Sequence, residues 1–330
     1  MGLKFGLTLT VLLLLGLDDN SFTTQMDAEA QTMSIKIGIA KWMENSDYNE
    51  NISGFKDSLK EYGFMEGVNV EYVERNPKGD ETIQREIIQE FIAMDVDLIY
   101  SLTTTGTLIA KDLTEDIPIV FSIVTFPVES GIVDSFESSG NNLVGTSNFV
   151  SVEKQLDLIY DISKAQKIGF LHRQGESNSK IQFELMMEYA ELKGISVVEI
   201  KPSNLDEVEN SINQVISEID VLYNACDTLV QSGAEEIAIS VGLENNKPTF
   251  SCNKAGINSG ALAGNVVDYK KIGELAGLKA VVILNGGNPS NILSEKQKDD
   301  NIFVNIESQK ILEIEIPKHI KNISNLRFAS

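Results

Sequence analysis

A row of hydroxyl residues follows one of the apolar segments in the first half of the chain. The sequence there is Ser101-Leu102-Thr103-Thr104-Thr105-Gly106, between a predicted strand over 97–100 and a predicted helix. Hydroxyls and free backbone N–H groups at the start of a helix can bind an anionic group such as a carboxylate. Thr103, Thr104 and Thr105 are therefore candidate ligand contacts, and the alternative is that they only cap their own helix.

A similar polar turn occurs in the second half of the chain. It reads Gly175-Glu176-Ser177-Asn178-Ser179 and lies between a predicted strand over 167–171 and a predicted helix over 180–193. The same physics makes Ser177, Asn178 and Ser179 candidate contacts, with helix capping again the alternative. Two such turns in two comparable halves favour binding of one ligand between the halves.

Two further polar segments follow the predicted strands over 221–223 and 248–250. Asp227 can hold a ligand ammonium group by a charge-assisted hydrogen bond, or it can cap the next helix. Asn253 occupies the corresponding place after the later strand. Cys226 and Cys252 have similar positions and are expected close together in space. We expect two small buried thiols, with a disulfide between them as the alternative.

Two aromatic residues also follow predicted strands of the first half. Trp42 comes directly after the strand over 35–40, and Phe126 follows the strand over 119–123. An exposed ring at such a position would form a flat wall for an apolar or aromatic ligand group. The alternative for both residues is ordinary packing in the core or at a hinge.

The motifs of several enzyme classes are missing from the sequence. There is no G-x-x-x-x-G-K-[ST] phosphate loop, no G-x-G-x-x-G, no G-x-S-x-G and no H-E-x-x-H. His172 is a lone possible base without a nucleophile or orienting partner in sequence. The cysteines and histidines lack metal-ligand spacing. We therefore predict no catalytic residues, no metal site and no cofactor, which favours a binding protein over an enzyme.

The charge balance excludes one class of partner. The chain of 330 residues has 49 acidic and 27 basic side chains and a formal net charge of −22. A surface this acidic repels phosphate backbones, so nucleic-acid binding is not expected. There is also no Lys/Arg cluster suited to an anionic membrane surface.

The N-terminus has the order of a secretory signal. Lys4 precedes an apolar run over 7–17, and a polar stretch then ends in Ala28-Glu29-Ala30. The run is shorter than the roughly 20 residues that span a bilayer. Residues 1–30 are thus predicted to be a signal peptide that directs export, with an uncleaved anchor as the alternative. No cysteine precedes Cys226, so a lipid-anchored form is not expected.

The elements that position these residues alternate regularly between strand and helix. Such alternation predicts an α/β fold with parallel sheets and helices on both faces. The pattern restarts near residue 150, so we predict two doubly wound parallel-sheet lobes joined by a hinge. Ligands of such sheets bind beyond the carboxyl ends of the strands. The predicted divisions are lobe 1 over 34–148 and 268–292, lobe 2 over 149–267 and 293–308, and a C-terminal helix and tail over 309–330.

Several stretches, taken in order, carry a family resemblance from about residue 35 to 316. The sequence resembles the ABC transporter substrate-binding proteins of the tryptophan/tyrosine-binding type, which have a type I periplasmic-binding-protein fold. Ser147 closes one of these stretches and joins the candidate contacts. The stretches are 54–55, 62–70, 97–99, 117–121, 127–133, 142–147, 152–158, 175–179, 260–262 and 268–269.

The resemblance implies an extracytoplasmic receptor that closes two lobes around a small ligand, often an amino acid. Its partners would be a membrane permease and the ATPase that powers it. By position, Thr104 matches the lobe-one hydroxyl of the family and 177–179 match its lobe-two helix start. Asp227 matches the aspartate of the usual Thr-Asp-Asn stretch.

This chain departs from the family pattern at two places. The family often has Asp at the position of Phe126, and Ser-Asp-Thr-Asp where this chain has Cys252-Asn253-Lys254-Ala255. Fewer carboxylates weaken the case for an ammonium partner, so the identity of the ligand stays open. A trans-acting ligand sensor and a hydrolase using His172 or Asp227 are the alternative functions.

Overall fold

The computed structural model describes residues 34–298, 301–323 and 326–329. The predicted signal peptide over 1–30 lies outside the described residues. Strands and helices alternate as expected, and the strands form two separate sheets of six and seven strands. The predicted α/β architecture with two doubly wound lobes is therefore confirmed.

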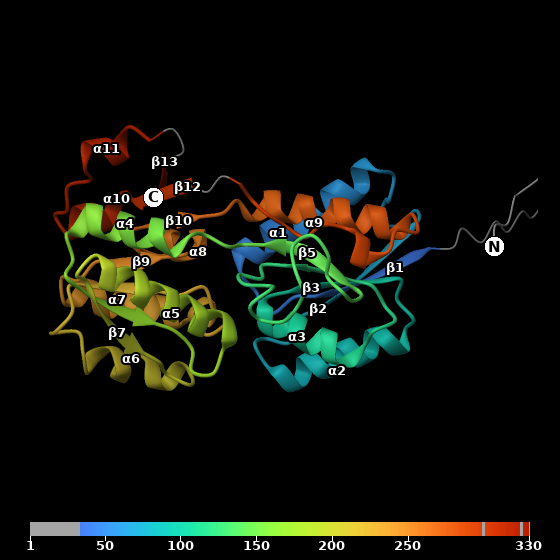
Figure 1. Ribbon diagram of the computed structural model, residues 1–330, viewed down its shortest axis with the longest axis horizontal. Coiled ribbons are helices and arrows are strands. Elements are labelled where there is room, and N and C mark those ends of the chain that lie inside the picture. Colours follow the sequence, from blue (N-terminus) through green and yellow to red (C-terminus); the bar gives the residue numbers. More distant parts are fainter. Residues whose placement is uncertain (1–33, 299–300, 324–325, 330) are drawn as a thin grey trace, which may run out of the picture. The chain divides into compact units, whose positions relative to one another are not determined.

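The first sheet is parallel throughout and has the order β11-β5-β4-β3-β1-β2. Helices α1 and α9 cover one face, and α2 and α3 cover the other (Figure 1). The strands are β1 Ile35–Ala40, β2 Val70–Arg75, β3 Leu98–Leu102, β4 Ile119–Ser122, β5 Leu143–Ser147 and β11 Glu295–Lys296. The helices are α1 Ser46–Glu61, α2 Glu81–Ala93, α3 Thr104–Leu113 and α9 Tyr269–Leu284, with the short η2 Pro289–Asn291.

Helices α1 and α9 pack so closely that their backbones touch through glycines. A Cβ atom on Gly273 of α9 would lie 2.0 Å from the carbonyl oxygen of Asn51, and one on Gly54 of α1 would lie 2.1 Å from that of Lys270. Only glycine fits such an approach, because backbone atoms cannot rotate away as side chains can. These residues fix α9, which comes late in the sequence, against the sheet formed by the first half of the chain.

We expect Gly273→Ala to lower the free energy of unfolding by about 2–3 kcal/mol, the upper range for an overpacked core. The overlap with α1 outweighs the roughly 1 kcal/mol by which alanine favours a helix over glycine. Urea unfolding measures the change. The control is Val282→Ala on α9, whose side chain is 47% exposed. A loss for Gly273→Ala no larger than that of the control would contradict the prediction.

The second sheet has the order β13-β12-β10-β9-β8-β6-β7, and all its described pairs are parallel except β10 with β12. Its strands are β6 Lys167–Leu171, β7 Ser196–Ile200, β8 Val221–Asn224, β9 Thr249–Ser251, β10 Ala263–Val266, β12 Asn301–Asn305 and β13 Leu326–Ala329. Its helices are α4 Val152–Ser163, α5 Ser177–Leu192, α6 Leu205–Asn213, α7 Ala234–Glu244, α8 Lys254–Asn258, α10 Ile306–Ile311 and α11 Lys318–Lys321, with the short η1 Val230–Ser232.

Alternate residues of the central strands pack into two different cores. Val221 and Tyr223 of β8 belong to a cluster with α4 and α5. Leu222, between them, belongs to a cluster with α6 and α7. Because successive side chains of a strand point to opposite faces, these clusters lie on the two faces of the second sheet. Burial on both faces explains why its strands read as unbroken apolar runs.

The chain passes between the two sheets three times, after β5, after β10 and after β11. The first crossing lies between β5 and α4, and the second lies between β10 and α9. Strand β11 belongs to the first sheet, so the third crossing comes after Lys296 and beyond the predicted division at 292. The lobe boundaries themselves stay predictions.

The single helix predicted from Gln309 onward is wrong. Instead, α10 ends at Ile311, α11 is one short turn over Lys318–Lys321, and β13 adds to the edge of the second sheet beside β12. The chain leaves the helix just after the C-cap Leu312, at Glu313, whose φ of +53° is left-handed. Pro317 then stands at the N-cap of α11.

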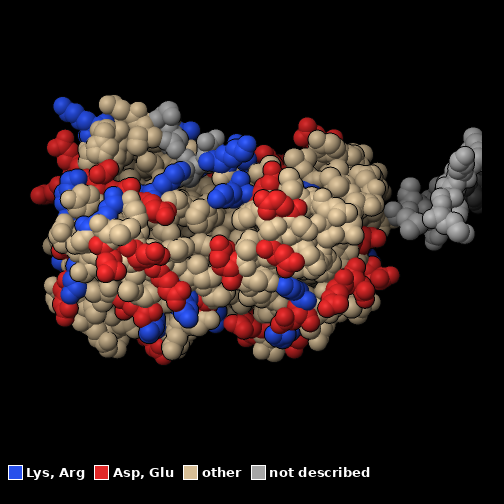
Figure 2. Space-filling model, in the orientation of Figure 1, with Lys and Arg blue, Asp and Glu red and all other residues tan. Residues whose placement is uncertain are grey.

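Acidic side chains occur on both lobes of the visible face, with basic ones among them (Figure 2). This distribution agrees with the strongly negative net charge. Within the described ranges, no helix combines the length and apolar character needed to cross a bilayer.

Candidate functional site

The loops at the carboxyl ends of the strands in both sheets meet around one small cavity. From the first sheet come the turns after β3, β4 and β5, and from the second sheet the turns after β6 and β8. The lining residues are Thr103, Thr104, Ile123, Asn148, Glu176, Asn178, Cys226, Asp227, Thr228 and Gln231. The cavity measures about 10 Å³, roughly the room that one water molecule needs.

The wall from the first sheet is the start of helix α3. Thr103 has φ +72°, a strained conformation for a β-branched residue, and its Oγ1 accepts a hydrogen bond from the N–H of Gly106 at 3.1 Å. The Oγ1 of Thr104 is buried and has no hydrogen-bond partner within the described chain. A buried hydroxyl without a partner costs about 1–3 kcal/mol. This wall therefore offers a free hydroxyl and the N–H groups of the first helical turn that Thr103 does not cap.

Asn178 supplies a second unsatisfied polar atom from the opposite wall. Its Nδ2 donates to the carbonyl oxygen of Cys226 at 2.7 Å, which orients the side chain. Its buried Oδ1 has no partner among the described residues. Each sheet thus contributes one buried polar atom to the cavity that protein groups leave unpaired.

Asp227 is a buried carboxylate held by the backbone. It is only 2% exposed. Its Oδ2 accepts from the N–H of Arg173 at 2.6 Å, and its Oδ1 accepts from the N–H of Val230 at 2.8 Å. Burial raises the pKa of this carboxyl above its usual value, while the two backbone hydrogen bonds oppose the rise.

Glu176 lies beside Asp227 and is also buried. The hydroxyl of Thr228 donates to its Oε2 at 2.6 Å, and Arg173 Nη1 lies 3.8 Å from the same atom. Burial, and then the nearby charge of Asp227, raise the pKa of Glu176 to about 8, against the hydrogen bonds from Thr228. Two neighbouring buried carboxyl groups, with the partly exposed guanidinium of Arg173 close to Glu176, make this side of the cavity suited to a cation.

The other predicted contacts on the first lobe do not line this cavity. Trp42 is fully buried in the core, and its indole N–H has no partner among the described residues. Phe126 packs edge-on against Phe149, with ring centroids 5.6 Å apart. Ser147 donates to the carbonyl oxygen of Thr125, and Thr105 is half-buried on α3. Their roles in binding stay predictions.

On the second lobe, Ser177, Ser179 and Asn253 are also absent from the cavity wall. Ser177 is half-buried at the start of α5, and Ser179 donates to the carbonyl oxygen of Glu176 at 3.4 Å. Asn253 caps α8 and donates to Glu235 at 3.0 Å. Thr103, Thr104, Asn178 and Asp227 are the predicted residues that the fold brings together.

Several lining residues were missed from the sequence. Glu176 stands inside the predicted polar turn and could have been found there, as the one carboxylate in that turn. Asn148 directly follows the candidate Ser147. Gln231 had no such signal, because it lies beyond Asp227 in η1 and reaches the cavity only through the folded loop.

Side chains next to the cavity connect the two lobes. The hydroxyl of Tyr48 on α1 donates to Gln231. Asp47 accepts from the N–H of Ala255 at 3.1 Å, and burial raises the pKa of this carboxyl to about 6. Lys254 pairs with Glu50 at 2.8 Å. These contacts hold the polar loops of the two sheets against each other.

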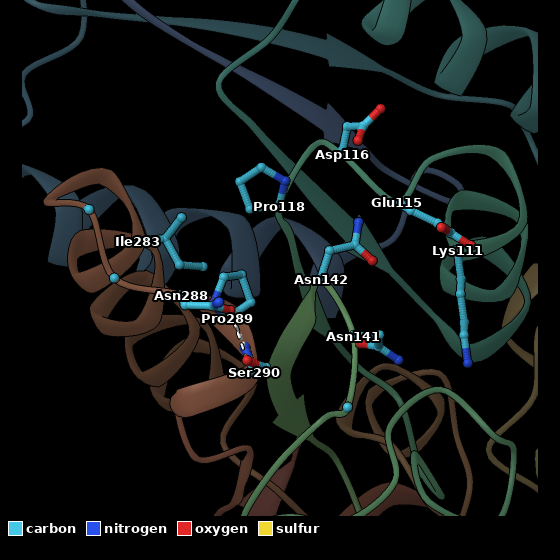
Figure 3. Close-up of a pocket in the computed structure, with 13 residues that line it drawn as sticks. Lys111, Glu115, Asp116, Pro118, Asn141, Asn142, Ile283, Asn288, Pro289 and Ser290 are labelled. Carbon is cyan, nitrogen blue, oxygen red and sulfur yellow. Dashed lines mark hydrogen bonds between the residues drawn. The ribbon is translucent and has the colours of Figure 1, made fainter. Parts of the chain in front are cut away.

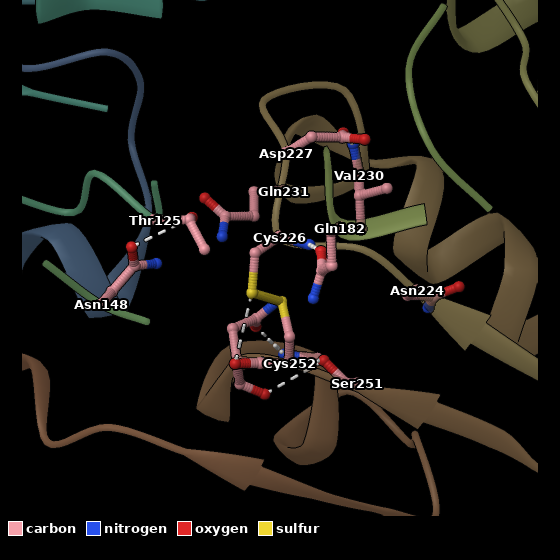
Figure 4. Close-up of a disulfide and its surroundings, with 12 residues drawn as sticks. Thr125, Asn148, Gln182, Asn224, Cys226, Asp227, Val230, Gln231, Ser251 and Cys252 are labelled. Carbon is pink, nitrogen blue, oxygen red and sulfur yellow. Dashed lines mark hydrogen bonds between the residues drawn. A yellow bond between two sulfur atoms is a disulfide. The ribbon is translucent and has the colours of Figure 1, made fainter. Parts of the chain in front are cut away.

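Cys226 and Cys252 form a disulfide, with Cα atoms 5.7 Å apart (Figure 4). The expectation of two buried thiols is therefore wrong. The reason is geometric: β8 and β9 are neighbours in the sheet, with Asn224 paired to Ser251, so the residues that follow each strand meet at its edge. Cys226 also lines the cavity.

A larger cavity of about 810 Å³ lies at the opposite ends of the strands in the first lobe (Figure 3). Pro118 and Asn142, just before β4 and β5, line it together with Lys111, Asp116 and Pro289. All of its lining residues belong to helices and loops of the first lobe, near the amino ends of β4 and β5. Doubly wound sheets bind ligands at the carboxyl ends of their strands, so this cavity is not where such a ligand site is expected.

Nowhere in the described ranges do three or more His, Cys, Asp or Glu side chains gather in a way that could hold a metal ion.

Known proteins resemble this chain in sequence and in fold. A family model described as ABC transporter substrate binding protein matches residues 36–325. A tyrosine-binding protein of Clostridioides difficile (strain R20291) is 33% identical over 330 residues, which cover 97% of this chain and 95% of that protein.

Two solved structures show the same type I periplasmic-binding-protein fold. A substrate-binding protein with adhesive properties from Clostridium difficile, in its ligand-free, open form, is 33% identical with a TM-score of 0.70, covering 90% of this chain and 99% of that one. A Streptococcus pneumonia ABC domain in complex with L-Trp is 24% identical with a TM-score of 0.85, covering 89% and 100%. Members of the matched family are extracytoplasmic proteins that bind small molecules for ABC transporters. This chain belongs to the ABC transporter substrate-binding protein family.

Proposed function

We propose that this protein is exported, captures a free amino acid between its lobes and delivers it to the permease of an ABC importer, without chemical change to the ligand. The main support for the proposal comes from the residues that line the cavity. The start of α3 and the hydroxyl of Thr104 lie on one wall, and the carboxyl groups of Asp227 and Glu176 lie on the other.

These two walls complement the two charged groups of an amino acid. The first turn of α3 and Thr104 would bind the α-carboxylate, because N–H groups and the helix dipole favour an anion there. Asp227 and Glu176 would bind the α-ammonium by charge-assisted hydrogen bonds. The family often has aspartates at the positions of Phe126 and Asn253 in this chain. Glu176 would take over part of their role by contacting the ligand ammonium. The tyrosine-binding relative makes L-tyrosine the first ligand to test.

Capture by this site requires the lobes to open. Small-molecule pockets commonly enclose about 300–1,000 Å³, far more than the cavity between the closed walls. A ligand that contacts both walls binds the closed form better than the open one and shifts the population toward closure. Opening must break contacts between the lobes, among them Tyr48 with Gln231, Asp47 with Ala255, Glu50 with Lys254 and Glu81 with Arg173.

Export is supported by two features. The N-terminal sequence has the order of a secretory signal, and the chain contains a disulfide, which persists in oxidising compartments outside the cytoplasm.

A thermal-shift screen of the twenty L-amino acids tests the proposal. A ligand at 100 times its Kd stabilises the native state by about 2.7 kcal/mol, so we expect a clear rise in Tm with L-tyrosine or a similar amino acid. Tyramine, which lacks the carboxylate, and 3-(4-hydroxyphenyl)propionate, which lacks the ammonium, are the matched controls and should give no rise. If none of the amino acids raises Tm, or if both controls act as well as tyrosine, the proposal is wrong.

A further inference from the structure

One covalent bond lies directly in the wall of the ligand cavity. Cys226 lines the cavity, immediately before Asp227 in the sequence, and its disulfide partner Cys252 lies behind it (Figure 4). Both cysteines are buried, with 7% and 2% exposure. The bond joins the second residue after β8 to the first residue after the neighbouring strand β9.

The short segment 226–228 positions both carboxyl groups of the cavity. Asp227 belongs to it, and Thr228 donates its hydroxyl and its N–H to Glu176. The hydrogen bonds at Cys226 tie the segment to α5, since its N–H donates to Gln182 at 3.1 Å and its carbonyl accepts from Asn178. A shift of Cys226 would therefore move the two groups that face a ligand ammonium.

The partner Cys252 stands on a firmly held loop. Its neighbour Asn253 donates to Glu235 at 3.0 Å, and Asn224, at the end of β8, donates to the same carboxyl group at 3.3 Å. Glu235 is itself buried on α7. The disulfide consequently connects the cavity segment to a loop that Glu235 anchors from within the second lobe.

We propose that the Cys226–Cys252 disulfide positions the Asp227 carboxylate in the cavity, so that ligand affinity depends on the oxidation state of this pair. The part of this proposal that concerns affinity rests on the proposed function, whereas the positioning of Asp227 does not. Reduction by dithiothreitol would transfer two electrons and two protons to the pair, giving two thiols and the cyclic disulfide of the reductant. The reduced protein would keep its fold and bind its amino acid more weakly.

The variant Cys252→Ser removes the bond without changing any residue of the cavity wall, and Cys226→Ala/Cys252→Ala removes both sulfurs. The first measurement is amide hydrogen exchange of the ligand-free protein by NMR. The N–H groups of Arg173 and Val230 report directly on Asp227, because each donates to its carboxylate. We expect their exchange to be at least tenfold faster in both variants, with amides of β10 and β12 unchanged.

The second measurement is the Kd for the amino acid that binds the wild type, by calorimetry. We expect Kd to rise at least tenfold in both variants. The matched control is Ile212→Ala, on the buried face of α6 in the same lobe. This variant should lower Tm but leave Kd unchanged. Unchanged exchange at Arg173 and Val230 overturns the positioning role, and an unchanged Kd overturns the effect on affinity. A wild type that binds no amino acid would instead defeat the proposed function, while the exchange measurement still decides the positioning.

Discussion

Replacing Asp227 by asparagine is expected to weaken amino-acid binding by about 30-fold to several thousand-fold. Losing one partner of a buried charge pair costs about 2–5 kcal/mol, and each 1.4 kcal/mol is a factor of ten in Kd. Asparagine has nearly the same shape but carries no charge. Its amide group also cannot accept from both the N–H of Arg173 and the N–H of Val230, as the carboxylate does. Isothermal titration calorimetry measures the effect.

The same substitution should leave the ligand-free protein about as stable as the wild type. Burial raises the pKa of Asp227, which means that the native state bears its charge at a cost. The substitution removes this cost, which offsets the one backbone hydrogen bond that asparagine cannot accept. A loss of affinity without a loss in Tm would separate a binding role from a folding defect. Glu218→Gln removes one exposed negative charge from the same lobe and is the matched control. A Kd for Asp227→Asn within threefold of the control would contradict the assignment.

The second large effect expected is a dependence of binding on pH. The pKa of Glu176 is raised to about 8, so much of this carboxyl is protonated near pH 7 in the ligand-free protein. A ligand ammonium beside it favours the ionised form, so binding releases a proton and affinity rises with pH. The increase is at most about tenfold per pH unit, or roughly 100-fold between pH 6 and 8. Above pH 8 it should level off.

The free energy of unfolding of the ligand-free protein should instead fall as pH rises. The pKa of Glu176 is raised from its ordinary value of 4.5 to about 8, so the native state holds more protons than the unfolded chain between these values. Its contribution to stability is complete below pH 4.5 and is lost as pH rises through 8. Burial also raises the pKa of Asp47 to about 6 and that of Glu235 to about 7, in the same direction.

Calorimetry in two buffers of different ionisation enthalpy counts the protons released on binding. Glu176→Gln should give a Kd that varies little between pH 6 and 8 and should reduce the proton release. If the wild-type Kd is flat over this range, or if Glu176→Gln keeps the wild-type slope, Glu176 does not contact the ammonium group.

The main architecture could be predicted from the sequence because burial on both faces leaves long apolar runs that are easy to recognise. The strands over 98–102 and 119–122 show this, because every residue in them is buried. The C-terminal segment was harder to predict, because β13 forms only by pairing with β12 and no local sequence pattern reveals that partner. Strand β11 is two residues long and is equally a product of its neighbour β5.

Residues of the candidate site could be predicted from the sequence only where they follow the end of a strand. Thr104, Asn178 and Asp227 each follow a strand closely and do line the cavity. Trp42 also follows a strand, but its ring turns into the core, because the side-chain direction depends on packing that sequence spacing does not reveal. The disulfide was missed for the same reason: the adjacency of β8 and β9 belongs to the fold and not to the spacing of two cysteines.

The three passages of the chain between the sheets limit how the protein can move. Two bodies joined by a single linker can twist, slide and separate, whereas three tethers suppress most of these degrees of freedom. What remains is bending at the tethers, as in a clamshell, so that every opening exposes the same two walls and every closing returns them to the same register. The polar loops of the two lobes therefore need no search to find each other when the lobes close.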